Sequence, residues 1–399
     1  MREIRRASPA VQSDTLNDKI VQENSFDYII AGGGLAGLSL AFYLNESRLQ
    51  NKKILIIDRD EKNKNDHTWC FWEKENSAFD EIVFRRWNSV WFHGTRGFNE
   101  KLDLGEYVYK MIRARDFYEF IFSKLGANFT VLQAEISAVE NGIVRTNKGD
   151  FTAKEFVFDS FTRKSYDNPK YRNLFQHFRG WLIETDENIF DENAPTLFDF
   201  RVEQKNECRF IYILPFSAKK ALIEFTVFSD NLLEQSEYDF FLKNYLLEVL
   251  KIENYNIAEI EFGVIPMSDE PHEEFPESKI IRIGTSGGYV KPSTGYSFSR
   301  TQKRLKDLVA ALEKNLEFQT ANRKWKLYLD SVLLDVLKKK SHRADDVFTA
   351  LFSRNETAQV LRFLDEESTF AEDLAIMKTV PLAPFAKSAM QVLLPDFRS

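Results

Sequence analysis

The feature that most constrains the fold is a glycine-rich turn that joins an apolar strand to a helix-like segment. Residues 26–30 are apolar and rich in β-formers, and the pattern G-x-G-x-x-G, made by Gly32, Gly34 and Gly37, follows directly. Gly32 permits the tight turn, Gly34 lets the backbone reach a pyrophosphate, and Gly37 lets helix and strand pack closely. A second apolar run ends at Asp58, where this fingerprint has an acid for a ribose hydroxyl. The sequence therefore predicts a dinucleotide-binding β-α-β unit with the phosphates at a helix N-terminus.

A second glycine cluster, late in the chain, favours a flavin over a nicotinamide dinucleotide. The apolar run 279–284 is typical of a strand, and residues 297–316 have helical spacing. The turn between them supplies further predicted cofactor contacts, which are Gly284, Thr285, Gly287, Gly288, Gly295 and Tyr296. In two-domain flavoproteins such a unit returns to the cofactor and points a helix N-terminus at the flavin ring or the ribityl arm. An ordinary βα loop that uses glycines for its turns is the alternative.

Composition narrows the class of protein. The 399 residues are enough for two domains, and the net charge of −7 argues against nucleic acid as a partner, because phosphate binding needs a basic patch. Cys70 and Cys208 offer no disulfide framework and suit a reducing cytoplasm. No apolar run reaches the roughly 18–20 residues that span a bilayer. Residues 1–25 lack the apolar segment of a secretory signal, so we interpret them as a disordered tail.

The order of the apolar patterns predicts an α/β fold whose nucleotide domain is interrupted by a β-rich lobe. Residues 26–160 and 262–320 form the predicted FAD-binding domain, in which residues 61–120 are loop-rich. Residues 161–261 contain segments that alternate like antiparallel strands with one covered face, and they form the predicted substrate lobe. Residues 321–399 have a helical pattern with prolines only near the end. We therefore expect a Rossmann-type domain, a β-rich lobe and a helical C-terminal region.

Several segments resemble those of one family. Asn65-Asp-His-Thr-Trp-Cys-Phe-Trp72 closely resembles the Asn-Asp-Arg-Thr-Trp-Cys-Phe-Trp segment of bacterial lycopene cyclases. Further segments resemble the same family in the same order, namely Tyr109–Arg113, Asp116–Tyr118, Val157–Ser160, Gln176–Trp181, Leu222–Thr226, Gly263–Met267, Gly284–Phe298 and Val360–Glu366. The resemblance covers residues 26–385, and runs of this length with two or more tryptophans are far more specific than a glycine motif.

The resemblance implies a particular fold and activity. Members of the family look like flavoproteins of the p-hydroxybenzoate-hydroxylase type. They close the linear end groups of lycopene into β-ionone rings, and they need bound, reduced FAD although the reaction has no net redox change. A family carboxylate in a Leu-x-Glu-x-Thr setting corresponds to Glu224, and Arg113 joins the predicted cofactor contacts. NAD(P)H is the expected source of electrons for the flavin.

Two positions depart from the pattern that the resemblance implies. His67 stands where the family commonly has arginine, and a histidine would make a flavin-phosphate contact weaker and sensitive to pH. A tolerated surface change is the favoured alternative, because Trp69 and Trp72 are retained. Thr285 stands where many related flavoproteins have aspartate, which removes a negative group near the ribityl arm.

Glu224 is the predicted catalytic residue. It lies in the apolar run 221–228, where burial would disfavour the charged form and raise the pKa of its carboxyl. Cyclisation begins with a proton delivered to a terminal alkene carbon, which is a very poor base, so the acid must be strong, aimed and shielded from water. Leu222, Glu224 and Thr226 share one face of the expected strand. Two alternatives stay open, since the reduced flavin could donate the proton and Glu224 could be an edge-strand residue that faces solvent.

An apolar polyene needs a route from the membrane to the enzyme. Without a spanning helix, we expect a cytoplasmic protein that docks peripherally on the inner face of the membrane. The stretches 347–352 and 380–385 could form the docking face, although core packing is the favoured interpretation. Trp69, Phe71 and Trp72 would suit the wall of a polyene tunnel, because aromatic faces favour both a conjugated chain and a cation. Ordinary core packing explains each of them equally well.

Other functions remain in competition with ring closure. A flavin mono-oxygenase or another oxidoreductase acting on an apolar isoprenoid would share this fold, and a non-catalytic flavoprotein or lipid carrier is a third class. One-ended cyclisation to γ-carotene competes with two-ended cyclisation to β-carotene. The five histidines are scattered and no C-x-x-C pair is present, so the sequence indicates no metal site. It indicates no oligomeric state.

Overall fold

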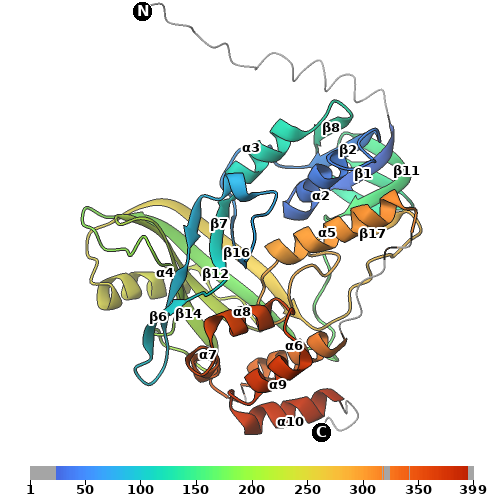
Figure 1. The fold of residues 1–399 in the computed structure, drawn as a ribbon. Coiled ribbons are helices and arrows are strands. Elements are labelled where there is room, and N and C mark those ends of the chain that lie inside the picture. Colours follow the sequence, from blue (N-terminus) through green and yellow to red (C-terminus); the bar gives the residue numbers. More distant parts are fainter. Residues whose placement is uncertain (1–23, 317, 319–323, 341, 394–399) are drawn as a thin grey trace, which may run out of the picture.

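The computed structural model describes residues 24–316, 318, 324–340 and 342–393. The predicted tail, residues 1–25, therefore lies outside the described residues except for its last two, and Ser25 already belongs to the first strand. The described chain forms three regions: an α/β layer, a large curved sheet and a group of C-terminal helices (Figure 1).

The α/β layer is built on a seven-stranded sheet. Its strands are β1 (Ser25–Ala31), β2 (Ile54–Asp58), β8 (Phe129–Gln133), β9 (Ile136–Glu140), β10 (Ile143–Thr146), β11 (Gly149–Asp159) and β17 (Ile280–Arg282). The order is β8-β2-β1-β11-β10-β9, and β17 pairs in parallel with the end of β11. Residues 28–31 and 54–57 are buried, as expected for central parallel strands covered on both faces. Figure 1 shows the helices α2 (Leu35–Asn45) and α5 (Phe298–Glu313) packed side by side against this sheet, with α3 (Ala114–Lys124) beside them.

The large sheet is mainly antiparallel. Its order is β16 (Asn256–Ser268), β12 (Asn173–Glu184), β15 (Lys220–Ser229), β14 (Cys208–Ser217), β13 (Thr196–Asp199), β5 (Ser89–His93) and β6 (Asn99–Asp103). One face is covered by α4 (Gln235–Asn244) and the π-helical turn Tyr245–Val249 that continues it. Along β15 the odd-numbered Ile223, Phe225 and Val227 face α4, and the even-numbered side chains face the opposite way. Because side chains alternate between the two faces of a strand, only the even-numbered side chains of β15 can reach a substrate on the face opposite α4.

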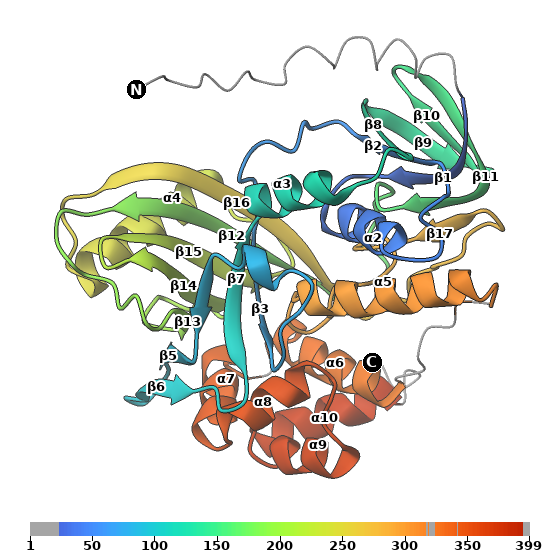
Figure 2. The same cartoon turned by 45° about the horizontal axis from the view of Figure 1, so that its top comes forward.

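A small sheet and the C-terminal helices enclose that opposite face. The small sheet has the order β3 (Thr68–Glu73), β7 (Val108–Arg113), β4 (Arg85–Trp87), and a short 3-10 helix, Asp80–Ile82, precedes β4. The helices are α6 (Lys324–Lys338), α7 (Ala344–Ser353), α8 (Thr357–Leu364), α9 (Phe370–Met377) and α10 (Leu382–Leu393). Figure 2 shows β3 and β7 between the α/β layer and the large sheet, with the C-terminal helices on the lower side. Within the described ranges, every helix is too short or too polar to span a bilayer.

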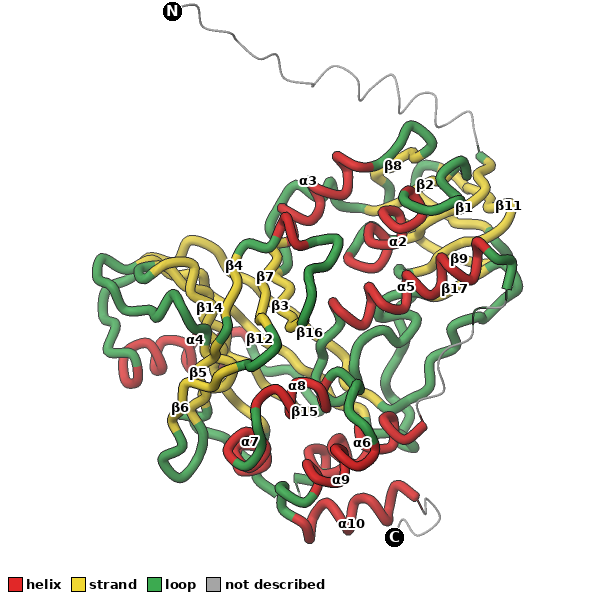
Figure 3. Tube along the Cα trace, viewed as in Figure 1, coloured by secondary structure: helices red, strands yellow, loops and turns green. Residues whose placement is uncertain are grey.

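The course of the chain differs in places from the expected one. Residues 61–120 were expected to be loop-rich, but they form five strands, β3 to β7 (Figure 3). Two of these strands, β5 and β6, belong to the large sheet rather than to the nucleotide layer. The strand β16 crosses the expected boundary at 261/262. The division into residues 26–160, 161–261 and 262–320 stays a prediction, since strands from different ranges belong to the same sheet.

Candidate active site

The first glycine turn has the local geometry that a bound dinucleotide requires. A Cβ on Gly37 would lie 2.0 Å from the Gly32 carbonyl oxygen, so only glycine allows α2 to approach β1 this closely. A Cβ on Gly34 would meet no atom within 4 Å, so the space in front of the α2 N-terminus is open. The Asp58 Oδ2 atom accepts a hydrogen bond of 2.6 Å from the backbone N–H of Gly33, which ties the turn to the end of β2.

The second glycine cluster meets the first turn. Gly284 has a positive φ of 64°, and a Cβ there would lie 2.9 Å from the Cβ of Ala36 in the first turn of α2. A Cβ on Gly287 would lie 2.2 Å from the Arg282 carbonyl oxygen, so this glycine is required by the tight turn itself. The exposed Thr285 accepts a hydrogen bond from the N–H of Gly288 through its carbonyl. The two clusters predicted from sequence thus form one continuous surface.

The loop that follows carries this surface towards the large sheet. Gly295 has a positive φ of 73°, and a Cβ there would lie 2.4 Å from the Gln176 Oε1 atom. Among the described residues, the Gln176 Oε1 and Thr294 Oγ1 atoms are buried without a hydrogen-bond partner. Buried polar atoms are normally satisfied, so this pair marks a place where a polar ligand would fit. Tyr296 follows directly and turns its ring into the cavity described below.

Arg113 lies apart from the glycine turns. Its guanidinium donates to Asp116 through Nε (2.6 Å) and Nη2 (2.9 Å) and stacks over the ring of Phe84 at 4.0 Å. It sits at the end of β7, opposite Thr68 of β3. His67, the position that departs from the family pattern, has an exposed side chain whose ring lies 6.1 Å from that of Trp69.

An inner cavity of about 150 Å³ lies between the large sheet, β3, the 293–298 loop and α7. Its wall is mostly aromatic and aliphatic, with residues that include Trp69, Trp72, Phe178, Phe198, Phe210, Phe228, Ile265, Phe298, Phe348 and Phe352. The polar groups on the wall are few, chiefly Glu224, Tyr109, Tyr212, Tyr296, Gln176 and Thr226. An apolar chamber with a few convergent polar groups is the usual form of a site for an apolar ligand.

Glu224 lies on the wall of this cavity, which excludes the solvent-facing alternative. Its side chain is only 8% exposed and projects from the even-numbered face of β15. Within the described part of the chain, no ion pair and no hydrogen bond engages its carboxyl. Burial raises the pKa of Glu224 well above its ordinary value, and the negative charge of Glu261 raises it further. Burial and the neighbouring charge thus both favour the protonated form of the carboxyl.

A second acid, the half-buried Glu261, lies on β16, two strands away. In the pairing of the three strands, Gly180 of β12 stands opposite Glu224 of β15 on one side and opposite Glu261 of β16 on the other. The backbone N–H and the hydroxyl of Thr68 donate to the Glu261 carboxyl, at 3.3 Å and 3.2 Å. Burial raises the pKa of Glu261 to about 7, although the two bonds from Thr68 oppose the rise.

Three tyrosines and a cysteine surround the other side of Glu224. Tyr212 stands opposite Glu224 in the β14–β15 pair, and its hydroxyl is hydrogen-bonded to that of Tyr109. The Tyr109 hydroxyl also lies 3.3 Å from that of Tyr296. Burial raises the pKa of each of these tyrosines and of the neighbouring Cys70 thiol, so all four groups are neutral. The acid thus faces neutral hydroxyls and aromatic rings.

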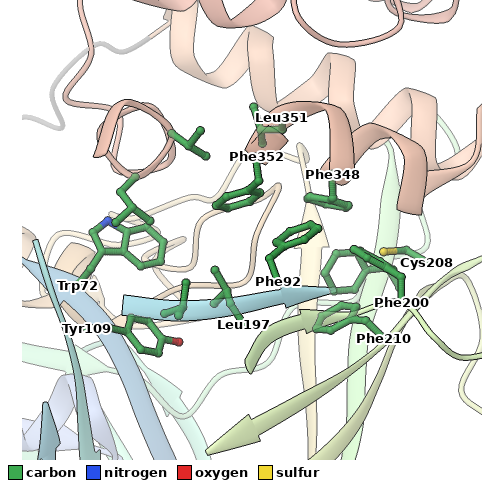
Figure 4. Close-up of a cluster of buried hydrophobic side chains, with 14 of the residues drawn as sticks. Trp72, Phe92, Tyr109, Leu197, Phe200, Cys208, Phe210, Phe348, Leu351 and Phe352 are labelled. Atoms are coloured by element: carbon green, nitrogen blue, oxygen red, sulfur yellow. The ribbon is translucent and has the colours of Figure 1, made fainter. Parts of the chain in front are cut away.

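The stretch 347–352 belongs to the core rather than to an outer surface. Phe348 and Phe352 of α7 point towards Phe92 and Phe200 of the large sheet (Figure 4), and Phe352 is 3% exposed. The core packing that the sequence favoured is confirmed for these residues, and the docking face suggested there is wrong. Figure 4 also shows Trp72 and Tyr109 on the near side of the same cluster.

An outer cavity of about 670 Å³ adjoins the inner one and shares Trp72, Tyr296 and Phe298 with it. It lies between α5, α6 and the segment after α8. Its floor carries Asp365, whose pKa burial raises to about 7, with the charge of Glu367 adding to the rise. The outer cavity is wider and more polar than the inner one.

Sequence reasoning missed Glu261, Tyr109, Tyr212 and Asp365 as members of the site. β16 carries the only available signal for Glu261, an alternation of polar and apolar residues over 259–262. That alternation is equally typical of an exposed edge strand. Tyr212 comes from the preceding strand β14 and Tyr109 from the distant strand β7, and the sequence did not show the registers that bring them to the site.

One family model matches nearly all of the chain. The model described as lycopene cyclase protein matches residues 27–390. The chain belongs to the lycopene cyclase family. This cyclase-family chain is 28% identical over 290 residues to a lycopene beta-cyclase from Pseudescherichia vulneris, covering 68% of this chain and 70% of that protein. It is 26% identical over 286 residues to a lycopene beta-cyclase from Pantoea ananas, covering 68% and 71%. The resemblance inferred from Asn65–Trp72 and the other segments is confirmed.

Solved structures share the fold of this lycopene cyclase family member at low sequence identity. A flavoprotein/dehydrogenase from Cytophaga hutchinsonii has a TM-score of 0.63 at 10% identity and covers 93% of this chain and 100% of its own. A geranylgeranyl bacteriochlorophyll reductase-like protein from Thermoplasma acidophilum has a TM-score of 0.56 at 12% identity, with 94% and 97% covered. The predicted fold class is confirmed: a Rossmann-type domain, a β-rich lobe and a helical C-terminal region.

Proposed function

We propose that the protein is a lycopene β-cyclase, which closes the linear end groups of lycopene into β-rings by acid–base chemistry. The observation that carries this proposal is Glu224, a carboxyl without an ionic partner on the wall of an aromatic cavity. The relatives from Pantoea ananas and Pseudescherichia vulneris, which are lycopene beta-cyclases, supply the substrate class. Both ends of the substrate are chemically alike, so we propose that β-carotene forms by way of γ-carotene.

Glu224 acts as the acid in this proposal. Its proton moves to the CH carbon of the terminal double bond of an end group, which leaves a tertiary cation on the adjacent dimethyl carbon, and a neighbouring double bond attacks this cation to form the ring bond. Loss of one ring proton gives the product, so no proton and no electron is consumed overall. The aromatic rings of Trp72, Tyr212 and Tyr296 line the cavity and favour a cation over their faces. The apolar wall excludes water, which would otherwise capture the cation.

The residues present fit FAD as the cofactor. The space at Gly34 leaves the α2 N-terminus open to a pyrophosphate, and the Gln176 and Thr294 oxygens, which have no hydrogen-bond partner among the described residues, would be free to bond a polar edge of the cofactor. Bound, reduced FAD would supply an electron-rich ring that stabilises positive charge without net redox change, and NAD(P)H is the proposed source of its electrons. The role of Arg113 would be to hold the start of α3 and the neighbouring β3, since its guanidinium is paired with Asp116.

The test of the proposed function is Glu224→Gln in a protein loaded with FAD. With lycopene in lipid vesicles and reduced flavin, we expect cyclisation to fall by about 10²–10⁴-fold, the usual contribution of a positioned acid. Glu184→Gln is the matched control, because Glu184 lies on the adjacent strand β12, is exposed, and pairs only with Lys220 at the surface. Cyclisation by Glu224→Gln at the parental rate would remove Glu224 from the chemistry. Consumption of NAD(P)H and oxygen with a hydroxylated product would instead show a mono-oxygenase.

We also propose that the C-terminal helices meet the membrane. The outward sides of α9 and α10 carry five exposed apolar residues, here called the α9–α10 face: Phe370, Leu374, Leu382, Met390 and Leu393. Leu382 is 63% exposed and Met390 60%. The exposed Lys378 and Lys387 flank this face and suit anionic headgroups. Leu327 of α6 is also exposed and lines the outer cavity.

A further inference from the structure

The buried Glu224 and the half-buried Glu261 are placed as a pair by the sheet. Gly180 is the cross-strand partner of both Glu224 and Glu261, so the three residues form one row across β15, β12 and β16. Residues that are directly opposite in a sheet project from the same face, and adjacent strands lie roughly 4.8 Å apart. The Cα atoms of the two acids are therefore separated by two strand spacings, with a glycine between them.

The glycine is what lets the carboxyls interact. A Cβ on Gly180 would lie 2.9 Å from the Cγ atom and 3.4 Å from the Oε1 atom of Glu224. The Glu224 side chain thus leans over Gly180, in the space that any other residue would fill, and towards β16.

The surroundings of the two carboxyls are unequal. Glu261 accepts two hydrogen bonds from Thr68, one from its N–H and one from its hydroxyl, and such bonds favour the ionised form. Glu224 receives none within the described residues. The groups that face Glu224 from other elements are Glu261, Cys70 and the tyrosines at 212 and 296, and those near Glu261 are Thr68, Asp66 and Glu259. All of the titratable groups in this set are acidic or neutral.

We propose that Glu261 is a positioning residue for Glu224: the pair holds one negative charge, Thr68 fixes that charge on Glu261, and the charge across Gly180 keeps Glu224 in its acid form. Two like charges in a shared site cannot both be present at low cost, so ionising Glu261 first makes the ionisation of Glu224 harder. The inference rests on the proposed role of Glu224 as the acid, and it gives that acid a reason to stay protonated. Glu261 itself transfers no proton to the substrate.

The experiment is a comparison of Glu261→Gln with the parental holoenzyme. Removing the charge should make Glu224 ionise more readily, so the alkaline limb of kcat/KM for lycopene should move to lower pH by about one unit, while the rate at acidic pH stays near the parental value. Glu259→Gln is the matched control, because Glu259 is an exposed acid two residues away on the same strand. We expect its alkaline limb to stay within a few tenths of a unit of the parental one. An unmoved alkaline limb in Glu261→Gln would overturn the proposal.

A second measurement separates the pair from the reaction. Infrared difference spectra of the FAD-loaded protein without lycopene report the C=O stretch of protonated Glu224, identified by its loss in Glu224→Gln. This band should disappear at lower pH in Glu261→Gln than in the parent. If the band shifts between the parent and Glu261→Gln but the parent forms no rings, the proposed function is wrong and the proposed pairing of the two acids still holds. If rings form but the band titrates at the same pH in both proteins, the proposed pairing of the two acids is wrong and the proposed function still holds.

Thr68→Val provides the test if Glu261→Gln does not fold. This variant keeps both carboxyls and removes one of the two hydrogen bonds that fix the charge on Glu261. The charge on Glu261 should then form at higher pH, so the infrared C=O band of protonated Glu261 should persist to higher pH in Thr68→Val than in the parent. A Glu261 band that titrates at the parental pH or below would contradict the assignment of the charge to Glu261 by Thr68.

Discussion

Gly180 has no side chain, and the geometry of the site depends on that. A Cβ at this position would lie 2.9 Å from Cγ of Glu224 and 3.0 Å from Cδ1 of Leu222. Gly180→Ala should therefore displace the acid, reduce ring formation, and lower the free energy of unfolding by about 1–3 kcal/mol, as overpacking usually does. Denaturant unfolding and pigment turnover measure the two effects.

A double variant shows whether the contact with Glu224 is responsible. In a Glu224→Ala background the Gly180→Ala change should cost less free energy of unfolding than in the parent, because the clashing side chain is gone. Equal values in the two backgrounds would place the strain on Leu222 alone.

Glu261 also makes stability depend on pH. Its pKa is about 7 in the folded protein, against an ordinary value of 4.5, so between these values the folded chain binds more protons than the unfolded chain. The stabilisation is complete below pH 4.5 and is lost as the pH rises towards 7. Glu261→Gln removes this loss, so its free energy of unfolding, measured relative to the parent, should increase from acidic to neutral pH. Chemical denaturation at both ends of this range measures the difference, and a constant difference would contradict the expectation.

At the scale of elements, the loop between β17 and α5 depends on a buried ion cluster. The Lys291 ammonium lies 2.8 Å from Asp330 Oδ1 of α6 and 3.2 Å from Glu366 Oε1 beyond α8. Lys291→Met removes the cation that these carboxylates share, and we expect destabilisation of about 3–5 kcal/mol by thermal or denaturant unfolding. The matched control is Lys303→Met on α5, since Lys303 is 57% exposed and lies 4.0 Å from Glu367. Its effect should stay within about 1 kcal/mol, and an equal loss in both variants would argue against a special role for the cluster.

Elements whose burial follows from their own residues could be predicted from the sequence. The apolar runs of β1 and β2, the alternating segments of β12, β14 and β15, and the pattern of α5 each carry a local signal. The strands β3 to β7 do not, because they are only three to six residues long and become strands through pairing with partners far away in sequence. The same reason explains why Glu224 could be predicted and Glu261 could not. The neighbours of Glu224 in sequence are apolar, whereas Glu261 is bonded by Thr68 from a distant element.

At the scale of the whole molecule, the α9–α10 face lies at one end and α4 at another (Figure 1). Leu382→Glu/Met390→Glu should lower the fraction of protein that floats with vesicles containing anionic lipid, because both side chains are exposed on the proposed docking side. Phe240→Glu on α4 is the matched control, since Phe240 is 56% exposed but lies away from this face. Both variants should cyclise lycopene supplied in detergent at the parental rate. Equal flotation of the double variant and the parent would remove the α9–α10 face as the site of docking.

The large sheet takes β5 and β6 from the early part of the chain and pairs β5 with β13, which follows four further strands of the α/β layer. During translation, β5 therefore emerges long before β13. Its apolar side chains lack this partner until the nucleotide layer has been translated. Contacts between residues so distant in sequence form slowly. We expect nascent chains that end before β13 to expose Phe92 and its neighbours and to be the forms of this protein that chaperones retain.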